Sequence, residues 1–312
     1  MLAASSLRQR SALLQAARSF FIQQGYLEVD TPVRLPVCIP EANILPISSE
    51  GWFLQTSPEQ CMKRLLAGGC SQLFQLCHCF RAGERGRRHH PEFTMLEWYH
   101  AGWSYADMMR ECEAFIPALF AEASVRLQQP YTGMVQWQEY RIALAAPWER
   151  LTVQEAFYRH ASCPVADALA DGSFDEILVE LVEPHLGLNR PVFLYEYPAE
   201  LASLARLSEE QPGVAERFEL YIAGMEIANG FSELIDPVEQ RRRFEKEREI
   251  MRQNKLTVTM PERFLADLAG LGETAGTALC FDRLVMLFLG EASIDKVLPF
   301  IYEDLYKTYL FF

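Results

Sequence analysis

Residues 80–99 read FRAGERGRRHHPEFTMLEWY, and this stretch decides the fold. Its first half gathers cationic side chains around two glycines, namely Arg81, Arg85, Arg87, Arg88, His89 and His90. Its second half alternates as a strand does, with Phe93, Met95 and Glu97 on one face and Thr94, Leu96 and Trp98 on the other. Guanidinium groups bind phosphate oxygens in pairs and stay charged. We therefore expect a strand, a polyphosphate-binding loop and a returning strand; a solvated charged hairpin is the alternative.

The composition restricts the class of protein. A chain of 312 residues with 50% hydrophobic and 12% aromatic content suits a globular enzyme with one large domain, or one with an inserted lobe. The net charge of -13 argues against salt-driven adhesion to nucleic acid, so a small ligand or a protein partner is favoured. The amino terminus lacks the apolar run of a signal peptide and no segment has the length of a membrane span, so we expect a cytoplasmic protein without membrane contact.

Periodicity and capping residues predict the remaining elements. Helices are expected over residues 7–24, 58–66, 105–127, 237–254 and 281–289, the first ended by Gly25 and the fourth anchored by Phe244 and Ile250. Extended segments are expected over residues 26–32, 52–55, 191–198, 217–221, 225–229 and 276–280. Residues 130–215 carry no motif from which a function follows.

Several charged residues interrupt apolar, regular segments: Glu59, Arg81, Glu226, Glu233 and Arg283. A buried charge is costly unless it is paired or binds a ligand, so these residues predict a site for groups of both charges. Arg283 begins an apolar helix, where a cation opposes the helix dipole, and this position favours a bound anion.

Glu226 and Glu233 enclose the sequence IANGFS. Two carboxylates near a triphosphate typically bind Mg²⁺. A spacing of seven puts them on opposite faces of a straight strand, so the chain must bend or bulge at Asn229-Gly230 for both to converge. One buried and one solvated glutamate is the alternative.

Three segments in order resemble the signature motifs of class II aminoacyl-tRNA synthetases. Residues 25–32 with the preceding helix resemble motif 1, residues 80–99 motif 2 and residues 276–290 motif 3. Lysyl-tRNA synthetases are similar in particular through TSPE at 56–59, HHPEFTMLEWY at 89–99 and GMEIANGFSEL at 224–234. The resemblance implies an α+β fold, an antiparallel sheet flanked by helices, with one catalytic domain over residues 1–312, in which about 130–215 is inserted or peripheral. Motif 1 implies a homodimer.

The expected first helix begins within the first residues, so we expect no amino-terminal anticodon-binding domain of the kind those synthetases carry; in this the chain resembles the elongation factor P (R)-β-lysine ligase family. That family implies activation of (R)-β-lysine, or lysine, as an adenylate with ATP and Mg²⁺, and transfer to a lysine side chain of elongation factor P; no tRNA partner is expected. One alternative is a lysine-activating enzyme that acts on tRNA or another acceptor. Another is a catalytically idle, synthetase-like regulatory module.

The resemblance also implies roles for individual residues. The ATP-binding set is Arg81, Ala82, Gly83, Glu84, His90, Phe93, Glu226, Ile227, Cys280 and Arg283, with Phe93 on the adenine. The substrate-binding set is Ser57, Pro58, Glu59, Tyr99, Asn229, Glu233 and Ala278. Arg81, Glu226 and Arg283 are the expected catalytic residues, and Glu226 and Glu233 the expected metal ligands.

Four positions depart from the synthetase pattern. Gly83 stands where the motif has Glu and Glu84 follows it, His90 replaces Asn, and Cys280 replaces a Gly that lets the backbone approach the nucleotide. Ala278 stands where the synthetases generally have Gly, and its methyl group predicts a preference for a β-amino over an α-amino substrate; strand packing is the alternative.

Overall fold

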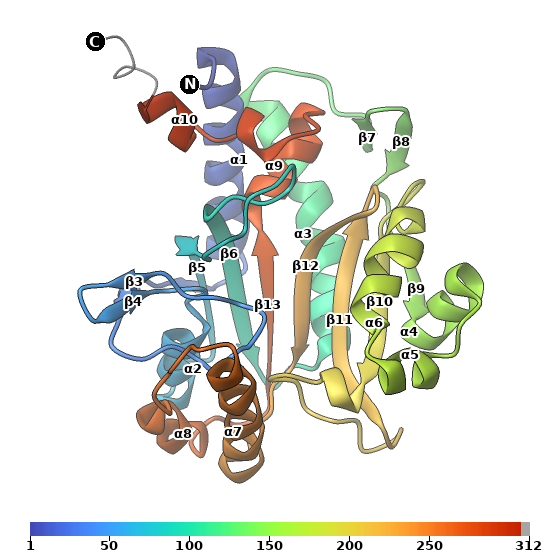
Figure 1. Ribbon diagram of the computed structural model, residues 1–312. Helices are drawn as coiled ribbons and strands as arrows, with labels where there is room; N and C mark the ends of the chain where they lie inside the picture. Colours follow the sequence, from blue (N-terminus) through green and yellow to red (C-terminus); the bar gives the residue numbers. More distant parts are fainter. Residues whose placement is uncertain (307–312) are drawn as a thin grey trace.

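The computed structural model describes residues 1–306, and its centre is one eight-stranded sheet (Figure 1). From edge to edge the strands are β1 (Leu27–Glu28), β5 (Gln72–Phe80), β6 (Glu92–Ala101), β13 (Thr274–Cys280), β12 (Met225–Ser232), β11 (Val214–Ile222), β10 (Val192–Pro198) and β9 (Glu149–Thr152). The inner pairs are antiparallel, whereas β1–β5 and β10–β9 are parallel. The expected α+β architecture is confirmed, with a mixed rather than wholly antiparallel sheet.

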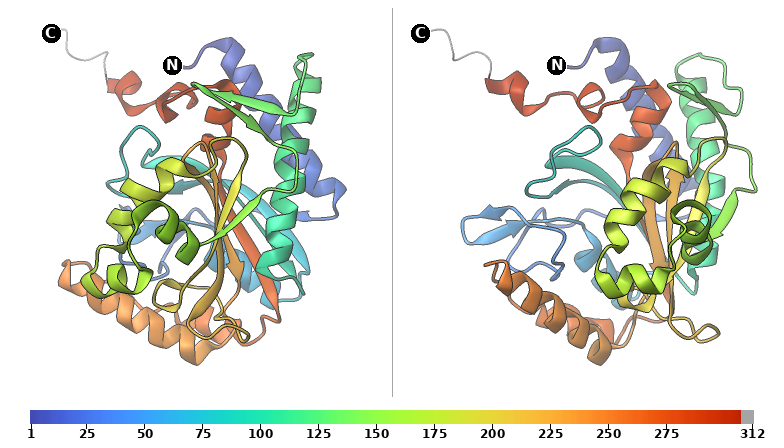
Figure 2. Two further views of the ribbon diagram at one scale, coloured as in Figure 1. Left: turned by 90° about the vertical axis from the view of Figure 1, so that its right-hand side faces the viewer. Right: turned by 45° about the vertical axis from the view of Figure 1, so that its right-hand side comes forward.

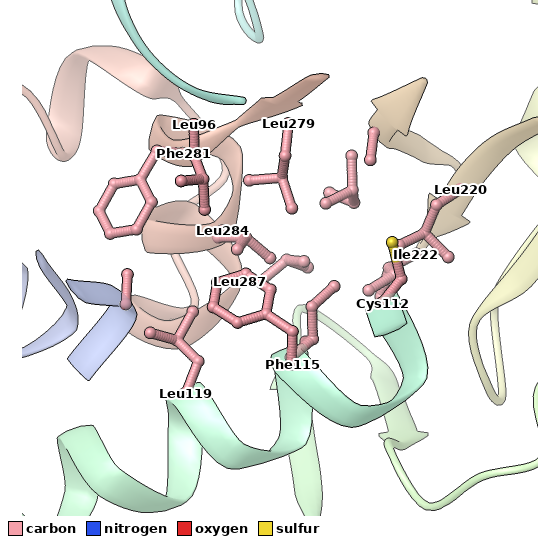
Figure 3. Close-up of a cluster of buried hydrophobic side chains, with 14 of the residues drawn as sticks. Leu96, Cys112, Phe115, Leu119, Leu220, Ile222, Leu279, Phe281, Leu284 and Leu287 are labelled. Atoms are coloured by element: carbon pink, nitrogen blue, oxygen red, sulfur yellow. The ribbon is translucent and has the colours of Figure 1, made fainter. Parts of the chain in front are cut away.

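One face of the sheet is covered by three helices, α1 (Ala4–Gln23), α3 (Tyr105–Arg126) and α9 (Phe281–Leu289) (Figures 1 and 2). Aromatic rings fill this layer, where the Phe21 ring centroid lies 5.0 Å from that of Phe115 and 5.2 Å from that of Trp98. Figure 3 shows the same layer nearer α9, where side chains from α3 meet those from α9 and the strands. No helix within residues 1–306 is both long and apolar enough to cross a membrane.

The opposite face of the sheet is only partly covered. A small sheet of β2 (Arg34–Leu35), β4 (Trp52–Leu54) and β3 (Ser48–Ser49) lies at one end of it with α2 (Glu59–Ala67), α7 (Pro237–Gln253) and α8 (Glu262–Leu268) (Figure 1). In α7 the buried apolar residues are Phe244 and Met251, while Ile250 is 37% exposed. The prediction of Ile250 as an apolar anchor was therefore wrong, because the next residue, Met251, takes the buried position on the helix.

Residues 130–215 include β9 and β10 and lie along the β9 edge of the sheet. They form β7 (Met134–Trp137), β8 (Tyr140–Ala143), α4 (Val153–Ala156), α5 (Val165–Asp171), α6 (Phe174–Ile177), the π-helical turns Phe157–Ala161 and Leu178–Val182, and the 3₁₀ turns Glu183–His185 and Ala199–Leu201. Short helices pack here on a separate apolar cluster that includes Phe157 and Phe174, whose rings stack 4.8 Å apart. Whether this region is an insertion in a single catalytic domain stays a prediction.

The motif-like segments match their predicted elements closely. The first helix ends before Gly25, whose φ of +84° favours glycine and where a Cβ would come within 2.8 Å of Gln72 Nε2. The strand expected over 26–32 is reduced to Leu27–Glu28, and its pairing ends well before Pro32. The last strand runs into α9, and Gly290 ends that helix in the left-handed conformation.

The carboxyl-terminal segment packs on the basic loop between β5 and β6. It contains a 3₁₀ turn at Ile294–Lys296 and α10 (Tyr302–Tyr306). Arg85 of the loop donates to both oxygens of Asp295, each at 2.9 Å, and to Glu303 at 3.1 Å. This arginine is therefore engaged by protein carboxylates.

A buried ion pair joins α1, β6 and α9. Arg10 Nη1 lies 2.6 Å from Asp282 Oδ1, and Asp282 Oδ2 accepts a hydrogen bond from the Thr94 backbone N–H at 2.7 Å. Arg10 also donates to the Thr94 hydroxyl at 2.8 Å. Because Asp282 is fully buried, its charge depends on Arg10 for compensation.

We predict that Arg10→Met lowers the free energy of unfolding by about 3–5 kcal/mol, because it leaves a buried carboxylate without its counter-charge. Adding Asp282→Asn should restore part of this loss, since the amide removes the charge and keeps an oxygen for Thr94. Urea unfolding measures both effects. Arg18→Met is the control, because Arg18 pairs with Glu28 at the surface and should cost less than about 1 kcal/mol. Equal losses in the two single variants would contradict the argument.

Candidate active site

Two adjoining pockets open on the uncovered face of the sheet, one of about 330 Å³ and one of about 260 Å³. The first pocket lies toward α2, and the second lies toward the loop between β5 and β6. Residues that line both are Ile44, Arg81, Met95, Arg217, Glu219, Asn229 and Ala278. The two pockets therefore adjoin and form one cavity over β6, β13, β12 and β11.

A buried lysine organises the first pocket. Lys63 of α2 is 2% exposed and forms ion pairs with Glu59 on its own helix and with Glu233, which follows β12. Burial raises the pKa of Glu233 to about 8. The positive charge of Lys63 acts in the opposite direction, and the negative charge of Glu59 raises the pKa further. Two acids thus share one buried cation, which leaves the pocket acidic.

A glycine, Gly276 of β13, also lines the first pocket and lets the Tyr99 ring lie against the strand. A Cβ at Gly276 would lie 2.3 Å from the Tyr99 ring and 2.9 Å from Glu233 Oε1, so a side chain there would have no room. Glu233 Oε1 is buried and accepts no hydrogen bond from the described part of the chain. A buried carboxylate oxygen without a donor favours a cationic ligand.

Glu97 was predicted on the Phe93 face of its strand but not as a site residue. It is fully buried and lines the first pocket, where it accepts hydrogen bonds from Ser57 Oγ at 2.5 Å and from the Tyr99 hydroxyl at 2.9 Å. Burial and the nearby Glu59 raise its pKa to about 8. An acidic residue inside the run TMLEWY was the only signal in the sequence.

Guanidinium groups dominate the second pocket. Arg81 lies with its Cζ 5.2 Å from the Phe93 ring centroid, and Glu84 Oε1 is 3.6 Å from Arg81 Nη1. Arg283 donates to the Glu226 carbonyl at 2.6 Å and lies 3.3 Å from the carboxylate of the same residue. Cations beside an aromatic face suit a nucleotide with a polyphosphate chain.

The two histidines of the loop differ in their surroundings. His90 is buried, with Nδ1 2.7 Å from the Glu92 carbonyl oxygen and its ring 4.8 Å from that of Tyr302. His89, which was not among the expected site residues, has Nε2 2.7 Å from Arg283 Nη2. Burial of the ring and the nearby positive charge of Arg283 both lower the pKa of His89. Its neutral ring therefore accepts a hydrogen bond from the guanidinium group.

The bulge expected in β12 occurs, but at another residue. Leu220 pairs with Ala228 and Tyr221 with Glu226, so Ile227 is the extra residue rather than Asn229-Gly230. The shift turns Glu226 to the same side of the sheet as Glu233. The two carboxylates nevertheless line different pockets.

Glu219 of β11, missed from the sequence, lines the second pocket together with Glu84 and Glu226. It accepts hydrogen bonds from Arg217 and from the Tyr221 hydroxyl, both at 2.7 Å. Within residues 1–306 no three His, Cys, Asp or Glu side chains group as a metal cluster. That Glu226 and Glu233 bind one metal ion stays a prediction; the two residues line different pockets, and Glu233 forms an ion pair with Lys63.

The structure brings most expected site residues to this cavity. The first pocket is lined by Ser57, Glu59, Tyr99 and Glu233, the second by Glu84, His90, Phe93, Glu226, Ile227, Cys280 and Arg283, and both by Arg81, Asn229 and Ala278. Pro58, Ala82 and Gly83 line neither pocket. At the Gly83-Glu84 departure, Glu84 is thus the acid that reaches the second pocket. Burial raises the pKa of Cys280 to about 11, so its side chain is a neutral thiol.

Comparison with known proteins gives a consistent result. The sequence profile of the family described as tRNA synthetases class II (D, K and N) matches residues 3–303. A protein of Salmonella gallinarum named elongation factor P--(R)-beta-lysine ligase is 38% identical, covering 95% of this chain and 94% of its own length. Proteins of the same name from Klebsiella pneumoniae and Proteus mirabilis are 39% and 38% identical, and each match again covers 95% of this chain and 94% of the relative.

The raised pKa of Glu97 predicts a dependence of stability on pH. The folded protein keeps a proton on Glu97 up to about pH 8, whereas the unfolded chain releases it near 4.5, so this group lowers the free energy of unfolding as pH rises from 4.5 to 8. Glu97→Gln, which carries no charge, should therefore become more stable relative to the parent protein by about 3–4 kcal/mol between pH 5 and pH 8.

Urea midpoints at the two pH values measure this difference. Glu122→Gln, at the surface of α3, is the control and should show no comparable change. A Glu97→Gln difference that is the same at pH 5 and pH 8 would show that the folded protein does not retain the proton.

Proposed function

The chain belongs to the class II tRNA synthetase family (D, K and N), and on this basis we propose that it is an ATP-dependent ligase for (R)-β-lysine with elongation factor P as acceptor. The observation that carries the proposal is the acidic first pocket beside an arginine-lined second pocket. The first suits a diamino acid and the second a nucleoside triphosphate. The relatives named above support the choice of amino acid and acceptor.

In this proposal the first pocket holds the two amino groups of the substrate. Glu97, Tyr99 and Glu233 supply buried oxygens for the terminal ammonium, which a charge-assisted hydrogen bond favours strongly. Glu59 and Ser57, at the start of α2, would hold the second amino group together with Asn229. A neutral side chain would leave these carboxylates unpaired, which is the basis of selection for an amine.

The second pocket would hold ATP. Phe93 would stack on the adenine, with His90, Ile227 and Cys280 beside it, and Arg283 would contact the terminal phosphates. The substrate carboxylate attacks the α-phosphorus, the adenylate forms and pyrophosphate leaves. Because Arg81 lines both pockets, it is the residue placed to neutralise charge at that phosphorus. No side-chain nucleophile is required, since catalysis rests on positioning and charge.

Mg²⁺ is part of the proposal, and the fit rests on Glu219 and Glu226. They are carboxylates on adjacent strands that line the same pocket as the arginines, and hard oxygen ligands are what Mg²⁺ prefers. Bound there, the ion would offset the charge of the phosphates. Arg217 and Tyr221 orient Glu219, and Arg283 lies beside Glu226.

Three further features complete the proposal. We propose a homodimer through α1 and β1, where Ile22 and Leu27 are 57% and 56% exposed at the edge of the main sheet. We propose that tRNA is not an acceptor, in keeping with the net charge of -13. A translation factor as acceptor would place the enzyme in the cytoplasm.

The function is tested by incubating the protein with ATP, Mg²⁺, (R)-β-lysine and elongation factor P. The factor's mass should rise by one β-lysyl unit, and tRNA under the same conditions should remain uncharged. Charged tRNA with unmodified factor would favour the tRNA-acting alternative. Absence of ATP–pyrophosphate exchange with either lysine isomer would favour the idle module.

Ala278 allows a test of substrate choice. It faces Glu97 across β6 and Asn229 across β12, at the junction of the pockets. Ala278→Gly should lower the ratio of kcat/KM for β-lysine to that for α-lysine by about 10-fold, because loss of the methyl group makes room for an α-amino group. ATP–pyrophosphate exchange measures the ratio. Ala275→Gly, on the core side of the same strand, should leave it unchanged; an unchanged ratio in Ala278→Gly would mean that Ala278 only packs the strand.

A further inference from the structure

The second half of the proposed reaction requires a proton acceptor. The attacking group is a lysine amine, whose ordinary pKa is about 10.4, so near neutral pH it arrives as an ammonium ion without a free electron pair. It must lose a proton before its nitrogen attacks the carbonyl carbon of the adenylate. A base within reach of the first pocket would speed this step.

Most carboxylates that line the first pocket are already engaged. Glu59 and Glu233 pair with Lys63, Glu97 accepts from Ser57 and Tyr99, Glu219 accepts from Arg217 and Tyr221, and Glu247 accepts from the Ala42 backbone N–H at 2.8 Å. The carboxylates of Glu41, Asp175 and Glu200 have no hydrogen bond or ion pair with any residue in 1–306. Asp175 and Glu200 are exposed at the rim, whereas Glu41 is half-buried in the wall. Glu41 is thus the available base inside the pocket.

Glu41 lies in the irregular segment between β2 and β3, which is fixed on both sides. Its neighbour Ala42 is bound by Glu247 of α7, and the Leu45 carbonyl accepts from the Ala82 backbone N–H at 2.7 Å. In Figure 1 this segment, in blue, lies in front of the sheet and above α7. The segment therefore connects α7 to the basic loop, and Ile44 within it lines both pockets.

We propose that Glu41 is the general base of the transfer step, a role that rests on the function proposed above. The acceptor ammonium gives one proton to the Glu41 carboxylate, and the freed electron pair forms the new C–N bond. The bond between the carbonyl carbon and the phosphate oxygen then breaks, and AMP leaves with that electron pair. The second proton of the nitrogen passes to the departing phosphate and on to solvent, so the products are the amide, AMP and two protons.

The charges around Glu41 fit this role. Burial raises its pKa to about 7, with Glu59 of α2 and Glu247 of α7 adding to the effect, while Arg81 of the loop and Lys63 of α2 oppose it. A base that titrates near the working pH accepts protons most effectively, because enough of it is ionised and it still holds a proton well. Glu41 also lines the same pocket as Arg81, the residue proposed to contact the α-phosphate.

The test separates the two half-reactions in Glu41→Gln. ATP–pyrophosphate exchange with (R)-β-lysine should keep kcat and KM within about 3-fold of the parent protein, while single-turnover transfer from the enzyme-bound adenylate to elongation factor P should slow by about 100-fold at pH 7. The deficit should shrink toward pH 9.5, where the acceptor amine loses its proton without help. Glu41→Asp should recover most of the rate, and Glu200→Gln, which removes the same charge at the rim, should transfer at nearly the parent rate.

Other results would overturn the assignment. A raised KM for β-lysine in the exchange reaction would make Glu41 a ligand of the substrate's amino group. A transfer deficit that stays constant with pH would mean that it only positions the acceptor, and an equal deficit in Glu200→Gln would point to attraction of the acceptor by charge. If the parent protein shows no exchange or no modified factor, the proposed function fails before Glu41 is in question.

Discussion

The ion pairs of Lys63 with Glu59 and Glu233 are the interaction on which the open face of the sheet depends. A buried cation would be costly alone, and here two acids, one buried and one half-buried, face the same ammonium group. The contact also fixes α2 against the end of β12, which are separated by some 170 residues of chain. An acidic cavity in a strongly acidic protein is stable for this reason.

The second constraint is the register of β12. Without the extra residue at Ile227, the side chain of Glu226 would turn into the apolar layer beneath the sheet, where Ala228 and Ile227 lie. The bulge instead turns it to the open face beside Glu219 and Arg283. A single irregularity thus decides that a carboxylate from β12 lines the second pocket, while Arg81 and Ala278 line both pockets.

The elements that follow a simple period could be predicted from the sequence. The alternation in residues 93–99 gave the two faces of β6, and the run of residues 276–290 gave β13, α9 and the glycine that ends it. The errors have local causes. Ile250 and Met251 differ by one position of helical phase, and the position of the bulge depends on pairing with β11, which no pattern within β12 reveals. Glu97 and Glu219 have the sequence pattern of ordinary strand residues. The contact of Glu97 with Ser57 joins distant parts of the chain, and the contact of Glu219 with Tyr221 depends on the direction of both side chains, so neither contact could be predicted from the sequence. Glu41 lies in an irregular segment that has no period at all.

Gly276 bears on the shape of the first pocket. With no side chain at this position, the Tyr99 ring lies directly against the backbone of β13, beside the buried Glu233 oxygen that accepts no hydrogen bond from residues 1–306. A methyl group there would have to displace this ring, whose hydroxyl donates to Glu97. The absence of one side chain on a central strand therefore fixes where an aromatic wall of the pocket lies, and with it the direction of a buried hydrogen bond.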